Sequence, residues 1–244
     1  MTLWLLGGID PTGGAGLWRD SWAAQVFAPD LRIRAVVTAW TWQGRGQRAR
    51  AQGADLAHFR ANCHGLADAQ AVKIGLLPSA VAVTLAAMHH GARPWVVDPV
   101  LGATSGGTFD VSMAALVALR RDRVVFTPNQ AEAQALLGTG AELSTSQLHA
   151  LARQLSPSPV LVKSARQDTT SVADVLIAGH SERWFVRSRQ PGPDPRGTGC
   201  ALSTAIAAGL AHGRSLVASI DAATKWLDGR RTQLRNVGGG HHFR

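Results

Sequence analysis

The chain of 244 residues contains no tyrosine and only two cysteines, Cys63 and Cys200. Two cysteines cannot build the disulfide framework of a small secreted domain, so we expect a reducing, cytoplasmic setting. No apolar run of about 18 residues lacks charged or polar breaks, which argues against a membrane span. The apolar start has no basic segment before it, so we expect no signal peptide. With 45% hydrophobic and 17% charged residues, the chain is too apolar for intrinsic disorder.

Acidic residues are few, 16 against 25 basic ones, and the formal net charge is +9. Such a balance can indicate nucleic acid, a membrane surface or small anions as partners. The basic residues are almost all arginines, and they are scattered rather than interleaved with aromatic residues. Nucleic-acid binding is therefore disfavoured. Much of the arginine excess is explained by an arginine- and alanine-rich coding bias.

Short apolar runs alternate with stretches that have helical character. The runs are rich in valine, isoleucine and leucine, as is typical of strands covered on both faces. The predicted strands are Leu3–Gly7, Ile33–Thr38, Ala71–Ile74, Trp95–Asp98, Val124–Thr127 and Val160–Lys163. Two later segments, Asp174–Ile177 and Trp184–Val186, predict a hairpin that adds an antiparallel edge.

Capping residues and glycine stops delimit the helices between these strands. The predicted helices are Ser79–Met88, Val111–Leu119, Asn129–Leu137, Ser144–Leu155, Cys200–His212 and Ser215–Trp226. Strands and helices that alternate in this way predict parallel βαβ units in an α/β fold, with one domain over residues 1–244. Gln43–Gln52 and Gln190–Gly199 predict surface loops, and we expect residues 237–244 to be frayed.

Two glycine clusters follow this pattern. The first, Gly7–Gly16, follows a strand and has neither dinucleotide-binding nor Walker A spacing, so it predicts either a tight turn or a close approach to a ligand. The second, Gly197–Cys200, opens a helix of small residues, where backbone N–H groups and the helix dipole predict an anion hole. A thiol in the first helical turn has a lowered pKa and can act as a base, so Cys200 is a candidate catalytic group. A small buried side chain in helix packing is the structural alternative.

Polar groups follow two further strands. Asn129 and Glu132 share a helix face, where the carboxylate suits water-mediated Mg²⁺ binding. The same pair equally predicts a helix cap with a capping box. Asp98 adds a second carboxylate at this edge of the sheet. Trp40 and Trp42 are candidates either for stacking on a ring or for core or lid packing.

Seven segments in order resemble the hydroxymethylpyrimidine and phosphomethylpyrimidine kinases of thiamine biosynthesis, in the ribokinase-like superfamily. They are GGIDPTGGAG, VVTAWTWQG, AVKIGLL, WVVDPVLGATSGG, FTPNQAEAQALLG, VLVK and RGTGCALSTAIAAGLAHG. The resemblance implies a three-layer α/β/α sandwich with a central, mostly parallel sheet. It implies ATP-dependent phosphorylation of a hydroxymethyl group and then of the resulting monophosphate, with Mg²⁺, in a homodimer.

The resemblance also assigns roles. It places Gly197, Thr198 and Gly199 in the anion hole and Cys200 at the catalytic position, where most sugar-kinase relatives carry aspartate. Gln43 would read the aminopyrimidine edge, since an amide offers donors and an acceptor in one plane. The further implied contacts are Gly8, Asp10, Trp42, Leu76 and Val100 to the substrate, Asn129, Lys163 and Arg196 to the nucleotide, and Asp98 and Glu132 to Mg²⁺.

Several positions depart from the family pattern. Ser164 and Ala165 stand where a glycine pair usually follows the lysine, and Arg196 stands where a histidine precedes the second glycine cluster. We expect Arg196, with Arg45, Arg48 and Arg50, to face phosphates. A kinase for vitamin B6 compounds and a non-catalytic pyrimidine-binding regulator remain alternatives.

Overall fold

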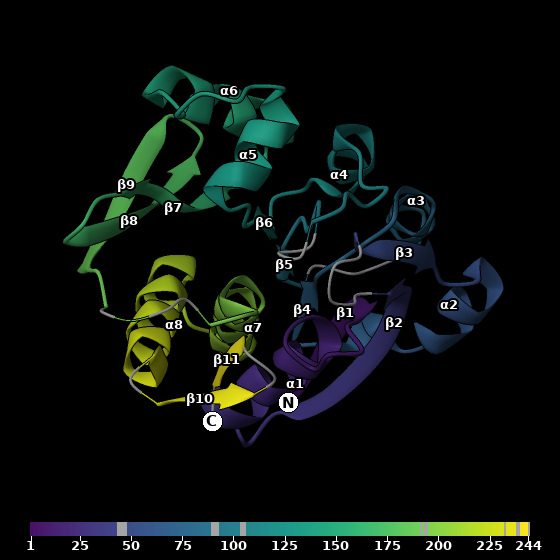
Figure 1. Cartoon of the computed structure of the whole chain (residues 1–244). Helices are drawn as coiled ribbons and strands as arrows, with labels where there is room; N and C mark the ends of the chain where they lie inside the picture. The colour runs from purple at the N-terminus through teal and green to yellow at the C-terminus, as the bar shows by residue number, and fades with distance from the viewer. Residues whose placement is uncertain are drawn as a thin grey trace.

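A computed structural model describes residues 1–42, 48–88, 93–102, 106–190, 192, 195–231, 233–237 and 240–243, with the backbone alone at 235–237 and 240–242. A nine-stranded sheet in the order β3-β2-β1-β4-β5-β6-β7-β8-β9 crosses the molecule (Figure 1). Neighbouring strands from β2 to β7 run parallel, while β3 at one edge and β8 and β9 at the other are antiparallel. The α/β fold class predicted from the sequence is thus confirmed.

The elements have the following bounds. The strands are β1 (Thr2–Ile9), β2 (Arg32–Trp42), β3 (Arg50–Gly53), β4 (Ala71–Ile74), β5 (Trp95–Val97), β6 (Val124–Phe126), β7 (Val160–Gln167), β8 (Ser171–Ala178), β9 (Ser181–Ser188), β10 (Leu234–Val237) and β11 (Gly240–Phe243). The helices are α1 (Gly16–Phe27), α2 (Leu56–Asn62), α3 (Ser79–Ala86), α4 (Met113–Leu119), α5 (Gln130–Leu137), α6 (Thr145–Leu155), α7 (Thr198–Ala211) and α8 (Leu216–Arg231).

Helices cover both faces of the sheet and form two separate cores. One core joins the sheet to α2–α6, and the other joins it to α1, α7 and α8 (Figure 1). Successive strand residues point to opposite faces, so Trp4 and Leu6 of β1 enter the first core while Leu3 and Leu5 enter the second. This explains why the strands are continuously apolar.

Small residues let α7 approach its neighbours closely. Ten of its residues are buried, and they include five alanines, Ser203 and Gly209 among others. A Cβ at Gly209 would lie 2.8 Å from Ser219 Oγ on α8, so the two helices meet backbone to side chain there. The helix therefore lies tightly under the sheet with its amino end fixed.

The structure confirms the predicted strands and the late hairpin but extends several of them. The sequence did not predict β3 or α2, because β3 is a polar edge segment that begins within the predicted loop 43–52 and α2 is short. Asn129 and Ser144 cap α5 and α6 through capping boxes. A capping role for Ser79 is wrong: Pro78 holds that position, and Ser79 Oγ instead contacts Asp110.

The carboxyl-terminal segment differs from the frayed end predicted for it. Residues 234–237 and 240–243 pair as an antiparallel hairpin, β10–β11. Phe243 is 3% exposed and stacks on Trp22 of α1. Burial of this ring gives the hairpin an anchor that the glycine-rich sequence does not reveal. Within the described ranges, no helix is long and apolar enough to cross a membrane.

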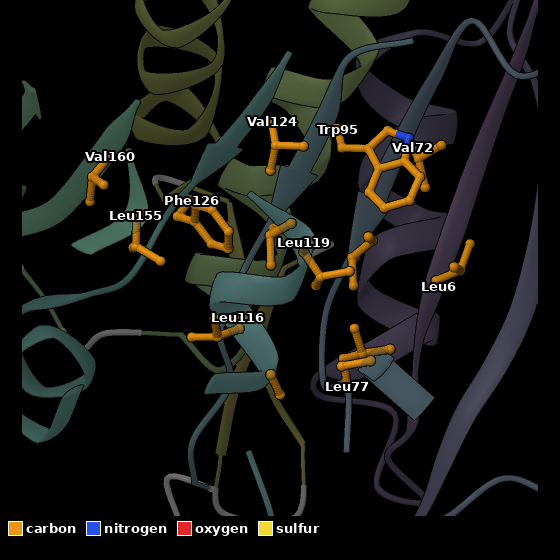
Figure 2. Packing of buried hydrophobic residues seen from close by; sticks show 14 of the residues in the cluster. Leu6, Val72, Leu77, Trp95, Leu116, Leu119, Val124, Phe126, Leu155 and Val160 are labelled. Carbon is orange, nitrogen blue, oxygen red and sulfur yellow. The ribbon is translucent and has the colours of Figure 1, made fainter. Parts of the chain in front are cut away.

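The first core generates a stability prediction. Leu155 of α6 is fully buried in this core with Phe126 and Val160 (Figure 2). Leu155→Ala should lower the free energy of unfolding by about 2–5 kcal/mol, through lost burial and the cavity left behind. Urea denaturation followed by circular dichroism measures this. Val186→Ala, at a position 69% exposed, is the matched control and should stay within about 0.5 kcal/mol. Equal effects of the two substitutions would contradict the packing described here.

Candidate active site

A cleft of about 360 Å³ opens where parallel strands of the sheet end and α7 begins. It is lined by thirteen of the residues to which the sequence assigned a role: Gly8, Asp10, Leu76, Asp98, Val100, Asn129, Glu132, Lys163, Arg196, Gly197, Thr198, Gly199 and Cys200. Gln43 lies outside the described residues. The structure thus brings the glycine, carboxylate and lysine motifs together in one place, although Gly8 and Cys200 lie 192 positions apart in the sequence.

The amino end of α7 supplies a cradle of backbone donors. Gly197 is its N-cap, in the left-handed conformation with φ of 76°, and no side chain caps the helix. The Ala201 N–H bonds the Gly197 carbonyl at 2.9 Å. The N–H groups of the first turn, from Thr198 to Cys200, precede any intrahelical bonding and line the cleft. This is the anion-binding geometry that the sequence predicts.

The first glycine cluster folds against the second. Gly16 has φ of 59°, and a Cβ there would overlap the Gly8 carbonyl oxygen. A Cβ at Gly197 would likewise overlap the Gly14 carbonyl oxygen. Both positions therefore require glycine, and the cluster serves both as a tight turn and as a wall of the cleft.

Cys200 lies in the first turn of α7, as expected, but its pKa moves in the unexpected direction. Burial raises the pKa of the Cys200 thiol to about 12, against smaller opposing effects of the Lys73 ammonium and the Gly16 N–H. The prediction of a lowered pKa is wrong, because desolvation outweighs the helix dipole at this depth. At neutral pH the sulfur holds its proton.

A buried ion pair lies beneath the cleft. Lys73 of β4 and Asp20 of α1 are both fully buried, and Lys73 Nζ lies 2.8 Å from each Asp20 carboxylate oxygen. Thr204 of α7 donates to the same carboxylate at 3.0 Å. Burial disfavours the Lys73 ammonium, but Asp20, together with Cys200 and Asp98, outweighs that effect and raises the pKa of Lys73. The ion pair thus joins three elements and leaves a permanent cation at the cleft floor.

A second ion pair joins two predicted site residues. Lys163 Nζ lies 2.5 Å from Asp98 Oδ1, and both side chains are nearly buried. The Lys163 amine also lies 3.1 Å from where a Cβ at Gly199 would stand, so the lysine reaches the anion hole. Lys163 therefore connects the carboxylate at the end of β5 to the first turn of α7.

Asn129 and Glu132 form the predicted capping box, while Mg²⁺ binding by Glu132 stays a prediction. The Asn129 side chain accepts from the Glu132 N–H at 2.9 Å, and Glu132 Oε2 accepts from the Asn129 N–H at 2.7 Å. Glu132 nevertheless lines the cleft. Burial, together with the neighbouring Asp98 and against the attraction of Lys163, raises the pKa of Glu132 to about 7. A cation bound beside Glu132 would therefore favour the ionised form of this carboxyl group.

The donor set in the cleft fits a hard divalent cation completed by other ligands. Asp98 and Glu132 each use one oxygen in the contacts above, and each has a second oxygen. Among the residues that the structure describes, no three His, Cys, Asp or Glu side chains cluster as a metal site. Two carboxylates with phosphate and water oxygens are a typical arrangement for Mg²⁺, which keeps several waters.

Arg196 pairs across the cleft with a residue assigned to the substrate. Its guanidinium lies 3.5 Å from the Asp10 carboxylate and donates to Thr12 Oγ1 at 3.0 Å. The Asp10 carboxylate is held in place because it accepts hydrogen bonds from the Thr12 N–H and the Thr12 hydroxyl. The contact closes the loop before α7 onto the first glycine cluster.

Ser164, which replaces a family glycine, lines the cleft with a strained backbone. Its φ of 48° lies in the left-handed region. The Ser164 N–H donates to the buried Asp174 carboxylate at 2.6 Å, and Arg187 donates to the other oxygen of Asp174 at 2.7 Å. These bonds hold a conformation in which glycine would be free of strain.

The two tryptophans that are candidates for stacking on a ring are not among the residues that line the cleft. Trp40 and Trp42 are 52% and 55% exposed, and neither lines the cleft. Thr41, between them, does line it, since alternate residues of β2 point to opposite sides. Core packing for either tryptophan is therefore wrong, whereas the assignment of Trp42 to the substrate stays a prediction.

Sequence reasoning missed several cleft residues. They are Thr41, Lys73, Gly75, Phe109 and Arg231. A lysine inside the apolar segment AVKIGLL is a signal that could have found Lys73, since a buried charge requires a partner.

The arrangement defines a small-molecule phosphotransferase: a three-layer α/β domain with an anion hole, buried cations and carboxylates in one cleft. The model of the phosphomethylpyrimidine kinase family matches residues 10–243. The chain belongs to this family.

Known relatives agree with this assignment. A hydroxymethylpyrimidine/phosphomethylpyrimidine kinase of Streptomyces coelicolor is 33% identical over 96% of this chain and 89% of its own length. The solved structure of a Bacillus subtilis pyridoxal kinase in an ADP complex aligns with a TM-score of 0.82 at 21% identity, over 100% of this chain and 96% of that one. A Clostridium difficile phosphomethylpyrimidine kinase aligns with a TM-score of 0.70 at 21% identity, over 93% and 97%. At these identities the two structures establish the ribokinase-like fold.

Titration of Glu132 generates a prediction. Its pKa of about 7 in the folded protein exceeds the ordinary 4.5, so the folded state binds the proton more tightly than the unfolded chain. The free energy of unfolding should therefore lose a contribution as pH rises from about 4.5 to 7. Glu132→Gln, which keeps the capping box, should remove that loss.

Urea denaturation at pH 4.5, 6 and 7.5 measures the difference between wild type and variant. Glu142→Gln, at an exposed position on the loop after α5, is the matched control. If the stability difference between wild type and Glu132→Gln does not change with pH, the raised pKa is refuted.

Proposed function

We propose that this protein phosphorylates 4-amino-5-hydroxymethyl-2-methylpyrimidine, its monophosphate or both, with ATP, in thiamine biosynthesis. One observation carries the proposal: the uncapped amino end of α7 faces Lys163, Asp98 and Glu132 in a single cleft. The curated relatives bear the name of this activity, and a plant relative is a bifunctional enzyme of thiamine biosynthesis.

Phosphoryl transfer depends on position and charge rather than on an elaborate catalytic group. The first-turn N–H groups from Thr198 to Cys200 would stabilise the charge on the transferred phosphoryl group, because they are fixed before it arrives. Lys163, held by Asp98, would add a cation next to Gly199. Asn129 borders the same space and would lie against the nucleotide phosphates.

ATP is the donor that the kinase fold accepts, as the solved neighbours with ADP and AMP-PCP illustrate. Asp98 and Glu132 would hold Mg²⁺, which would neutralise the phosphate oxygens. Arg196, paired with Asp10, would bring positive charge to the phosphate of a monophosphate substrate.

Cys200 would accept the proton of the substrate hydroxyl. Because its thiol is protonated in the resting protein, the thiol would first release its own proton to solvent water, and the resulting thiolate would then take the hydroxyl proton as the phosphoryl group is transferred. The Lys73 ammonium and the Gly16 N–H favour that anion.

Gly8, Leu76 and Val100 would contact the ring, and Gln43 would read its amino edge. One domain, a homodimer and a cytoplasmic setting stay predictions.

The experiment that tests the function is an ADP-release assay with Mg-ATP and three acceptors: the hydroxymethylpyrimidine, its monophosphate and pyridoxal. We expect turnover with at least one pyrimidine. The kcat/KM for pyridoxal should be lower by at least about tenfold, since a pocket that pairs with the amino edge of the pyrimidine rejects a ring that lacks this edge. Preference for pyridoxal would favour the vitamin B6 alternative. Tight pyrimidine binding without turnover would favour a regulator.

Cys200→Ala should lower kcat by about 10²-fold or more, the range for loss of a proton-transfer group, and should leave the KM for ATP nearly unchanged. Cys200→Asp should restore part of kcat, since a carboxylate can take the same proton. The control is Cys63→Ala, which changes the other cysteine, buried in the first core. Steady-state kinetics with the best pyrimidine measure all three. Unchanged kcat in Cys200→Ala would remove this residue from proton transfer.

A further inference from the structure

The carboxyl-terminal hairpin contacts a side chain that reaches the anion hole. This side chain is Arg19 of α1, which is 5% exposed. Its Nε donates weakly to the Gly14 carbonyl at 3.5 Å, in the first glycine cluster. Its Cγ lies only 2.8 Å from where a Cβ at Gly197 would stand, at the start of α7. Arg19 therefore lies against both loops that form the anion hole.

The other end of Arg19 is held by aromatic rings. The guanidinium carbon lies 4.8 Å from the centre of the Trp22 ring and 5.1 Å from that of Phe243. The two rings stack on each other with centres 5.1 Å apart at 18°. Phe243 comes from β11, so the last strand of the chain completes the aromatic site of the guanidinium.

We propose that the β10–β11 hairpin positions the anion hole through Arg19. A free arginine side chain samples many rotamers, and each would leave a different space beside Gly197. The contacts with the rings of Trp22 and Phe243 restrict the rotation of the guanidinium. The aliphatic part of the Arg19 side chain is thereby fixed against Gly197 and Gly14. Donors that are fixed in advance stabilise a developing charge better than donors that must reorganise. The proposal rests on the function proposed above, because it assigns Arg19 and Phe243 as positioning residues for phosphoryl transfer.

The same aromatic cluster provides a control. Phe27 of α1 packs edge-on against Trp226 with ring centres 5.4 Å apart, and Trp226 lies 5.7 Å from Trp22. Phe27 thus belongs to the same core, but its ring contact is with Trp226 rather than Arg19. Loss of either phenylalanine removes a ring from this core, and only loss of Phe243 opens the site of the guanidinium.

The test compares Phe243→Ala, Phe243→Tyr and Phe27→Ala with wild type. Phe243→Ala should lower kcat about 10- to 100-fold while the KM for the pyrimidine changes little, since displaced donors mainly lose transition-state contacts. Phe243→Tyr, which keeps the ring, should retain most of kcat. Phe27→Ala should lower the melting temperature but leave kcat near wild type. Equal kcat losses in Phe243→Ala and Phe27→Ala, or none in either, would overturn the proposal.

Amide hydrogen exchange provides a measurement that does not need turnover. Residues 197–201 should exchange faster in Phe243→Ala than in Phe27→Ala, in the absence of ligand. Equal exchange rates would refute the positioning role even if the enzyme is active. If wild type phosphorylates none of the pyrimidines, the proposed function fails, while the exchange result still decides whether the hairpin orders this loop.

Discussion

The cleft depends on the contact between two glycine loops at the backbone level. The start of α7 lies so close to the first glycine cluster that a side chain at Gly197 would overlap the Gly14 carbonyl oxygen. This approach brings the Gly16 N–H to the Cys200 sulfur and opens the first N–H groups of α7 toward the cleft. Asp98, which directly follows β5, and Lys163 of β7 then meet these donors, although β6 lies between their strands.

Buried charges are the second constraint, and they are matched before any ligand binds. Lys73 with Asp20 and Lys163 with Asp98 place two cations under the cleft, each held by a carboxylate. Such fixed charges suit a site that receives phosphates, because little reorganisation is needed when the anion arrives. The overall +9 charge of the chain contributes less than expected. Arg196 is engaged with Asp10, and Arg48 and Arg50 are not among the residues that line the cleft.

Local patterns predicted the fold well where periodicity and capping carry the information. Ala71–Ile74 was predicted with the observed bounds, and the caps Asn129 and Ser144 start their helices as expected. The thirteen cleft residues could be predicted because the glycine and carboxylate motifs follow strands of a parallel sheet, and because the resemblance to the kinase family assigned the remaining contacts. Three features could not be predicted from the sequence. The pKa of Cys200 depends on burial depth, the placement of Trp42 on the register of β2, and the anchoring of Phe243 on Trp22, which is distant in sequence. Each is a property of tertiary packing.

The burial of two lysines has a practical chemical consequence. The chain has three lysines. The side chains of Lys73 and Lys163 are 0% and 7% exposed and bound in ion pairs, whereas Lys225 on α8 is 75% exposed. An amine-reactive reagent would therefore reach one lysine and the amino terminus. Because Lys225 does not line the cleft, a dye or a surface linker attached there would leave the site open. The scarcity of accessible amines makes the protein suited to labelling at one defined side chain without mutation.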